Sequence, residues 1–365
     1  MDHDETTNID FSVNKTFPES IYLANDSRFM ERVYHLIYPI LSWSIVATGA
    51  FGVIGNSLTL AVYAKLGFSE TIHMSYVALA VSDIGCNLTT MWVRMCYWPI
   101  VKEIFLGYGL QVNVGYFSYF TGGWPNLACS RTTALLTAWI GFERCLCVMF
   151  PTRVKLIITP TVTKIVLAVI YIIGCCPLVL AYIDFKAEMI FDIVARNYTA
   201  QVAHDRNQLN TPHRFAFFLY GAVYPLVSWI SVAIWAAFLI VKLKQSARWR
   251  KAHTRDISGP KDSTGERQQR VKSSNRGNRV TKTVVAIAVT FILCSSPKSA
   301  TIVISAAWRD FSQDGSLRFS FLTSAITSTV LNEINSSINI VVYALTGSKF
   351  RSTLLDFLPK KCSIK

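Results

Sequence analysis

The chain of 365 residues is 52% hydrophobic, and only 16% of its residues carry a charge. Soluble proteins average roughly 25% charged residues, and the mean hydropathy of +0.35 departs further from their range. This composition excludes a disordered or fibrous protein and predicts a chain that hides its surface in lipid. The net charge of +14 does not predict nucleic-acid binding, because the basic residues gather in a few stretches between long uncharged runs.

A membrane-spanning helix needs about 20 mostly apolar residues, and seven runs of the sequence are long enough. They are Tyr38–Ala64, Ile72–Ile100, Tyr116–Phe150, Ile165–Tyr182, Phe215–Val241, Val284–Trp308 and Phe319–Leu345. The third run is longer than a membrane requires, so its outer end near Gly122–Pro125 is either a loop or a kinked helix. The sequence therefore predicts an all-α membrane protein with a bundle of seven transmembrane helices over residues 38–345.

The distribution of lysine and arginine predicts the orientation of this bundle. These residues concentrate in the segments 65–71, 148–164, 242–282 and 346–365. Because basic loops stay in the cytoplasm, residues 1–37 should be extracellular and the protein a multi-pass protein of the plasma membrane. Three glycosylation sequons fall in outer segments, as this orientation requires. Their acceptors are Asn14, Asn25 and Asn197.

Two cytoplasmic segments stand out by composition. Residues 242–282 form a long, polar and basic third loop, which we expect to be largely disordered at its centre. This loop either only retains positive charge in the cytoplasm or also contacts partners and kinases near Ser273-Ser274. In the tail 346–365, apolar residues at helical spacing from Phe350 to Leu358 predict a short amphipathic interfacial helix. Cys362, after two lysines, is a candidate for palmitoylation.

Ionisable residues at membrane depth are costly, so each is a functional candidate. The candidates are Asp83, Arg94, Arg131, Glu143, Arg144, Lys298 and Glu333. A buried Asp83 among hydroxyl and amide groups either holds a small hard cation such as sodium or only makes hydrogen bonds between helices. A sodium site would use Asp83, Thr133, Asn335 and Ser336; no other cofactor is expected.

An ordered set of motifs runs through nearly every apolar run. The set comprises Gly55-Asn56, Leu79-Ala80-Val81-Ser82-Asp83, Glu143-Arg144-Cys145 with Pro151 downstream, Pro225, Phe291 six residues before Pro297, and Asn339-Ile340-Val341-Val342-Tyr343 followed by Phe350. With these motifs the chain resembles the rhodopsin-like (class A) G-protein-coupled receptors. The stretch from Thr137 to Lys155 also resembles an invertebrate, chiefly molluscan, chemosensory and peptide-receptor-like branch.

The sequence also departs from this family's pattern. Cys145 replaces the usual tyrosine after Arg144, and the proline after Asn339 is lost. Ser295 stands where the sixth helix of the family usually has its toggle-switch tryptophan. Another residue must therefore serve as this switch, or the switch is absent. No cysteine lies at the outer start of the third helix or in the outer loop 184–214. The family's disulfide therefore cannot form, which leaves the order of that loop open.

The resemblance narrows the class of ligand. Asn126 stands where receptors for amines carry an aspartate, and Glu333 stands where opsins carry the lysine that links retinal. The candidate ligand-binding residues are Arg94, Asn126, Ser130, Arg131, Lys298 and Glu333. Three cations against one carboxylate favour a peptide or a small molecule with an acidic group. Alternatively, Arg94 or Lys298 only neutralises Glu333.

The resemblance implies a signalling receptor in which an extracellular ligand biases an inactive–active equilibrium. The sixth helix would swing outward around Pro297 and open a cleft for a heterotrimeric G protein. The residues implied in coupling and switching are Glu143, Arg144, Tyr343, Phe291, Pro225, Pro297 and Asn339. Receptor kinases, arrestin and the lipid bilayer are the further partners. Gly277, where many members carry an acid that restrains Arg144, predicts noticeable basal activity.

Two other classes compete with the receptor hypothesis. A channel or transporter would need polar residues that continue from one face to the other, whereas Asp83 and Arg144 are followed by apolar stretches. A membrane enzyme would need a catalytic constellation, and the sequence has no HExxH motif and no paired cysteine and histidine set. The sequence therefore predicts a protein that is not an enzyme.

Overall fold

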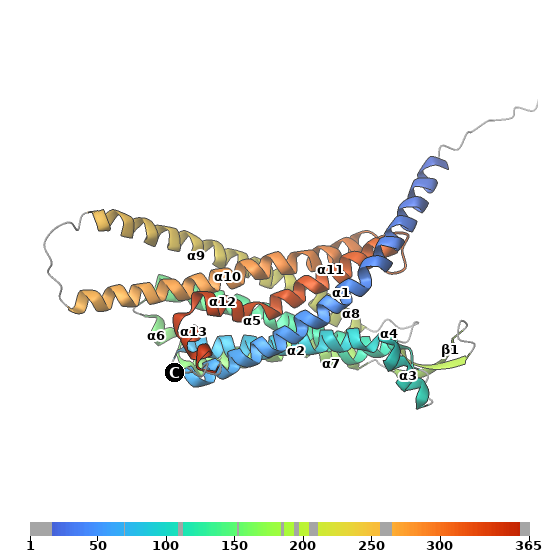
Figure 1. Ribbon diagram of the computed structural model, residues 1–365, viewed down its shortest axis with the longest axis horizontal. Helices are drawn as coiled ribbons and strands as arrows, with labels where there is room; N and C mark the ends of the chain where they lie inside the picture. The colour runs from blue at the N-terminus through green and yellow to red at the C-terminus, as the bar shows by residue number, and fades with distance from the viewer. Residues whose placement is uncertain are drawn as a thin grey trace, which may run out of the picture.

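The computed structural model describes residues 17–68, 70–108, 112–151, 153–183, 186–192, 197–203, 211–255 and 265–357. Its long helices run side by side along one axis (Figure 1). Seven segments form the bundle. They are α1 (Phe17–Leu66), α2 (Thr71–Cys96), α4–η1–α5 (Val114–Ser118, Tyr119–Gly123 and Trp124–Met149), α7 (Pro160–Tyr182), α8–η2–α9 (Thr211–Phe218, Leu219–Val223 and Tyr224–Arg255), α10 (Gly265–Ala307) and α11–α12 (Arg318–Ser337 and Asn339–Thr346).

Shorter elements close the two ends of the bundle. Helix α3 (Pro99–Gly107) and a hairpin of β1 (Lys186–Asp192) and β2 (Asn197–Ala203) lie at one end, near the outer part of α1. The helices α6 (Val154–Ile157) and α13 (Ser348–Leu355) lie at the other end, on the side where α9 and α10 project (Figure 1). This grouping matches the predicted division into outer and cytoplasmic segments. Helix α13 is the predicted interfacial helix.

Among the described residues, five helical stretches are long and apolar enough to cross a membrane. They are Arg28–Leu66, Val114–Met149, Pro160–Tyr182, Pro212–Gln245 and Thr281–Ala307. The remaining two helices of the bundle, α2 and α11, contain the buried carboxylates Asp83 and Glu333 and many buried hydroxyl and amide groups. These polar groups face other helices rather than lipid, so both helices can span the bundle with a less apolar composition.

Several helix boundaries differ from the sequence prediction for local reasons. The second run was predicted to continue to Ile100, but α2 ends at Cys96 because Pro99 disfavours helical geometry in the residue before it and itself starts α3. Helix α7 begins five residues earlier than predicted, at Pro160. The Thr159 hydroxyl caps it by accepting from the Val162 N–H at 3.3 Å, and a proline suits the first helical position.

The outer end of the third run is helical, which decides between the predicted loop and the kinked helix. A π-helical turn, η1, lies immediately before Pro125, and η2 has the same position before Pro225. Because proline lacks an N–H, the helix loses one hydrogen bond at each site. A π turn is one way in which a helix accommodates such a break.

Both flanks of the segment 242–282 are helical, although the predicted spanning helices ended at Val241 and began at Val284. Helix α9 continues to Arg255 and α10 starts at Gly265, and Figure 1 shows both helices extending beyond the rest of the bundle. Residues 256–264, the centre of the predicted loop, lie outside the described residues. The extensions of α9 and α10 therefore place the basic residues of this segment beyond the rest of the bundle.

The outer loop contains a β-hairpin that the sequence analysis did not predict. Strands β1 and β2 pair antiparallel, with Lys186 opposite Ala203 and Asp192 opposite Asn197. Strand β2 packs against α4 at the outer end of the third bundle helix. None of the described cysteines forms a disulfide. Hydrogen-bonded strands and packing on α4 therefore order this loop without the cross-link that the sequence lacks.

Candidate functional site

Asp83 is the centre of a polar cluster in the middle of the bundle. Its side chain is fully buried. The Thr133 hydroxyl on α5 donates to Asp83 Oδ1 at 2.9 Å, and the Asn339 amide on α12 donates to Oδ2 at 2.8 Å. Ser336 also hydrogen bonds with this carboxylate. Three helices are therefore joined at one carboxylate, as expected for a buried charge that must be hydrogen-bonded.

Of the four residues predicted for a sodium site, Thr133 and Ser336 bind the Asp83 carboxylate, while Asn335 is not among its hydrogen-bond partners in the described part of the chain. Thr133, Asn335 and Ser336 line one common cavity. Carboxylate, hydroxyl and amide oxygens are suitable ligands for a hard cation, so the residues fit sodium. The Thr133 hydroxyl is also 3.0 Å from the Ser82 hydroxyl. The alternative, hydrogen bonds between helices without an ion, is consistent with the same geometry.

The seventh bundle helix is interrupted at Ile338 although the family's proline is missing. The Asn56 amide on α1 donates to the main-chain oxygen of Ser336 at 2.8 Å, and the Ser337 hydroxyl donates to the Thr48 carbonyl at 2.9 Å. A side chain that takes a helical carbonyl is a known cause of a break in the helical hydrogen-bond ladder. Asn56 can therefore keep Asn339 in its place beside Asp83 without a proline.

The residues predicted to bind the ligand do not all line one cavity. The Asn126 amide donates to the Thr90 hydroxyl at 2.7 Å and approaches the Cys86 carbonyl at 3.2 Å, so it connects α5 to α2. Ser130 and Arg131 line the cavity that also contains Asn335 and Ser336. Neither Asn126, Arg94, Lys298 nor Glu333 lines that cavity.

Arg131 is the most unusual of these residues. Its side chain is buried, and its Nε and Nη2 atoms have no hydrogen-bond partner among the described residues. A buried guanidinium without partners is strongly unfavourable. The adjoining cavity has a volume of about 10 Å³, which is room for roughly one water molecule. An anion that reached Arg131 would therefore require the surrounding helices to separate.

Glu333 is buried against α1 and α2, where Gly49 leaves the space for its carboxylate. Neither carboxylate oxygen has a hydrogen-bond partner of good geometry. The nearby Thr90 hydroxyl donates its single proton to the Cys86 carbonyl at 2.9 Å.

Lys298 lies close enough to Glu333, Arg94 and Arg131 to interact with their charges. In the part of the chain that the structure describes, however, the salt bridges do not include a pair between Glu333 and a cation. The alternative that Arg94 or Lys298 neutralises Glu333 by direct contact is therefore not realised in this arrangement.

Trp229, on α9, is a residue that the sequence analysis missed. Its indole N–H donates to the Ser295 hydroxyl at 3.0 Å, and Ser295 donates to the Phe291 carbonyl at 2.5 Å. Trp229, Ser295, Phe291 and Arg131 line the same cavity. A tryptophan from the fifth bundle helix thus contacts the position where the sixth lacks one. The signal in the sequence was the pairing of an absent tryptophan at 295 with a present one at 229.

Phe291 and the two helix prolines lie where the resemblance placed them. Phe291 is buried on α10 and packs in a cluster with Ala134 from α5 and Val232 from α9. Pro297 lies inside α10, six residues further on, and Pro225 follows the π turn η2. Phe291 and Pro225 line the cavity beside Arg131, whereas Pro297 does not.

Glu143 joins α5 to α2 at the cytoplasmic end. Its carboxylate accepts from the Thr71 hydroxyl at 2.5 Å and the Ser75 hydroxyl at 2.9 Å. Arg144 Nη2 lies 3.2 Å from Glu143 Oε1, and this is the one salt bridge of Arg144 among residues with described side chains. Position 277, where the sequence analysis noted the missing acid, belongs to the part of α10 whose side chains the structure does not describe.

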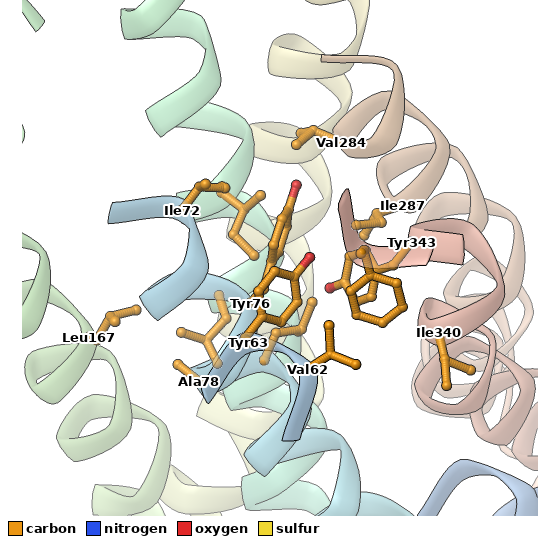
Figure 2. Close-up of a cluster of buried hydrophobic side chains, with 14 of the residues drawn as sticks. Val62, Tyr63, Ile72, Tyr76, Ala78, Leu167, Val284, Ile287, Ile340 and Tyr343 are labelled. Carbon is orange, nitrogen blue, oxygen red and sulfur yellow. The ribbon is translucent and has the colours of Figure 1, made fainter. Parts of the chain in front are cut away.

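Tyr343 lies in an aromatic cluster rather than beside Arg144. Its ring is 4.7 Å from that of Tyr76, 5.8 Å from that of Tyr63 and 5.5 Å from that of Phe350, measured between centroids. Figure 2 shows the three tyrosines gathered from α1, α2 and α12. The predicted cleft that both Tyr343 and Arg144 line is not open in this arrangement.

Two of the four predicted modification sites belong to residues that the structure describes. Asn14 and Cys362 lie outside the described residues. Asn25 lies in the outer part of α1, and Asn197 is the first residue of β2. Both are at the end of the bundle that the sequence analysis assigned to the outside.

Comparisons with known proteins agree with this architecture. A family model described as the serpentine type 7TM GPCR chemoreceptor Srw matches residues 51–361. Human neurotensin receptor type 1 is 24% identical over 86% of this chain and 74% of its own length. The allatostatin-A receptor of Bombyx mori is 24% identical over 89% and 80%, and a galanin-like G-protein coupled receptor of Caenorhabditis elegans is 22% identical over 90% and 74%. Squid rhodopsin superposes with a TM-score of 0.60 at 14% identity, over 89% of this chain and 86% of its own.

Proposed function

Because the chain belongs to the Srw family of serpentine seven-transmembrane G-protein-coupled chemoreceptors, we propose that it carries an extracellular acidic signal across the plasma membrane. The protein is a multi-pass membrane receptor that signals through G proteins. The alternative of a channel or transporter finds no support in the family or in the relatives.

The proposed ligand is a peptide with an acidic group, which binds between the outer halves of the helices. The relatives are named as receptors for neurotensin and allatostatin-A and as a galanin-like receptor, which supports a peptide. Arg131 carries the rest of the proposal, because it is buried with two unpartnered nitrogen atoms. A carboxylate that reaches Arg131 would replace these missing partners by charge-assisted hydrogen bonds.

Ligand binding at Arg131 would separate α9 from α10, because Arg131, Trp229 and Ser295 share one small cavity. The hydrogen bond between Trp229 and Ser295 is the contact that we expect to break. Helix α10 could then move outward around Pro297, and Arg144 and Tyr343 would become accessible to a heterotrimeric G protein. A sodium ion at Asp83 would favour the inactive arrangement, in which Trp229 and Ser295 are hydrogen-bonded. Receptor kinases and arrestin would bind on the cytoplasmic side. Asn14, Asn25 and Asn197 would be glycosylated, and Cys362 would be palmitoylated.

Peptide pairs that differ only in their C-terminus or in one acidic side chain test this proposal. Each peptide is compared with its uncharged amide in cells that display the receptor, with second-messenger output as the readout. The acidic member should be more potent by about tenfold or more, and Arg131→Gln should remove this preference while the amide keeps its potency. Equal potency of acid and amide on the unmodified receptor would refute the acidic ligand.

A further inference from the structure

A cavity of about 100 Å³ lies at the cytoplasmic end of the bundle, where the proposed ligand has no role. It is bounded by the ends of α1, α2 and α12, by the interior of α10 at Thr283 and by the first turn of α13. The rings of Tyr63, Tyr76, Tyr343 and Phe350 form its apolar wall, and Lys349 lies at its rim. Figure 2 shows the three tyrosines of this wall packed against one another.

Two hydroxyl groups of this wall are buried without a partner. Tyr76 and Tyr343 are 4% and 2% exposed, and neither phenol oxygen has a hydrogen-bond partner among the described residues. A buried polar group without a partner destabilises a structure by roughly 1–3 kcal/mol, so such groups are rare in native proteins. Both belong to residues that line the cavity, where a bound acceptor could satisfy them.

The charges around the cavity favour an anion. A second cavity of about 290 Å³ shares Thr346 and Ser348 with the first and adds Lys282 from α10 and Arg351 from α13. Within the described part of the chain, the salt bridges include neither these two cations nor Lys349. One acid lines the first cavity, Glu70, and it faces His73 at 4.0 Å.

The first turn of α13 adds to this positive field. Its N-cap is Gly347, so no side chain caps the turn. The start of a helix lies at the positive end of the helix dipole, which favours a phosphate-like anion nearby. Gly347, Ser348 and Lys349 all line the cavity.

We propose that these two connected cavities bind a phosphate monoester. Its oxygens would lie near the start of α13 and accept hydrogen bonds from Tyr76 and Tyr343, and Lys282, Lys349 and Arg351 would balance its charge. The phosphate could belong to the headgroup of an inner-leaflet phosphoinositide or to a soluble phosphate ester. The chemistry of the site is the same for both sources.

A phosphate monoester bound in these cavities would oppose signalling. The Thr283 hydroxyl on α10 donates to the Thr346 hydroxyl on α12 at 2.6 Å, directly at the edge of both cavities. A phosphate held between Lys282 and Arg351 would connect α10 to α13, the helix that directly follows α12. A ligand that binds only this arrangement stabilises it, so it would hold the foot of α10 against α12. This inference does not depend on the extracellular ligand.

The test measures the thermal unfolding of the purified full-length receptor in phosphatidylcholine nanodiscs. One arm adds phosphatidylinositol bisphosphate to the bilayer, and the other adds inositol trisphosphate to the buffer. A rise in unfolding temperature in the lipid arm alone supports a lipid source, and a rise in both arms supports a site open to soluble esters. No rise in either arm would overturn the proposal.

Three variants make the result specific. The double variant Lys282→Gln, Arg351→Gln should weaken the apparent affinity for the phosphate at least about tenfold. Tyr76→Phe, which keeps the ring but removes one unpartnered hydroxyl, should weaken it by a smaller factor. Lys65→Gln is the matched control, because Lys65 lies at the same end of the molecule but pairs with Asp356 at 3.1 Å. An equal loss of affinity in Lys65→Gln would show unspecific charge attraction and would overturn the site.

Discussion

Trp229 and Ser295 form a single hydrogen bond between α9 and α10, and its removal should change the resting state of the receptor. We expect Trp229→Phe to raise basal second-messenger output about fivefold. This factor corresponds to about 1 kcal/mol, the net contribution of one neutral hydrogen bond. We expect basal output to rise because the hydrogen bond exists only while α10 lies against α9.

A double-mutant cycle checks that this effect arises from the contact itself. Ser295→Ala removes the acceptor, and the double variant should be no more active than the stronger single variant, because both changes delete the same interaction. Additive effects of the two substitutions would show that Trp229 acts by another route. Surface expression of each variant provides the normalisation.

Asp83 permits a separate prediction about sodium. The unfolding temperature of the purified receptor should be higher in sodium chloride than in choline chloride at equal ionic strength, since a cation among these oxygens binds the folded protein only. Asp83→Asn should abolish this difference, because an amide offers no charge to the ion. A difference that persists in the variant would place the sodium effect elsewhere.

Single residues show where sequence reasoning reached its limit. The pairing of Asp83 with Thr133 was expected, because a buried carboxylate needs hydroxyl groups around it; Asn339, which also binds Asp83, had been assigned to switching instead. The partners of Glu143 could not be predicted, since Thr71 and Ser75 belong to another helix and any hydroxyl on α2 could have served. The lack of a hydrogen-bond partner for the Glu333 carboxylate could not be predicted either, because it depends on distances of a few ångströms between helices.

Helix α13 is held by packing rather than by its surface ion pair. Phe350 is 3% exposed, between the rings of Tyr63 and Tyr343. Phe350→Ala should destabilise this element by about 3 kcal/mol, the usual effect of removing a buried aromatic ring. Hydrogen exchange should then be faster along residues 348–355.

The contrasting substitution is Asp356→Ala, which removes the pair with Lys65. Both side chains of this pair are more than half exposed, so the loss should be below about 0.5 kcal/mol. If Asp356→Ala released α13 as strongly as Phe350→Ala, the packing account of this helix would be wrong.

At the scale of elements, the sequence predicted the type and the number of the long helices better than their ends. Hydrophobic length and basic flanks identify a spanning helix because the membrane imposes both. The continuation of α9 and α10 beyond the membrane escaped prediction, since these polar segments have no apolar face that would mark them as helical. The β-hairpin escaped because its strands are only seven residues each and are ordered by contact with α4.

At the scale of the whole molecule, the glycine at 277, where many members of the family carry an acid that restrains Arg144, predicts basal activity. Gly277→Glu should place an acid at the foot of α10 and lower basal output, because it restores a partner for Arg144. Asn278→Glu is the matched control. It adds the same charge about 100° around the helix and should leave basal output nearly unchanged. Equal effects of both variants would indicate a general charge effect.

The central claim is that this bundle activates a G protein through the cytoplasmic end of α5. The most direct measurement is guanine-nucleotide exchange on purified heterotrimeric G proteins by the receptor in nanodiscs, without added ligand, for the unmodified chain and for Arg144→Ala. We predict exchange above that of empty nanodiscs with at least one G-protein class, and its loss in Arg144→Ala at unchanged thermal stability. Exchange at the level of empty nanodiscs for every class, or full exchange by the variant, would contradict the account.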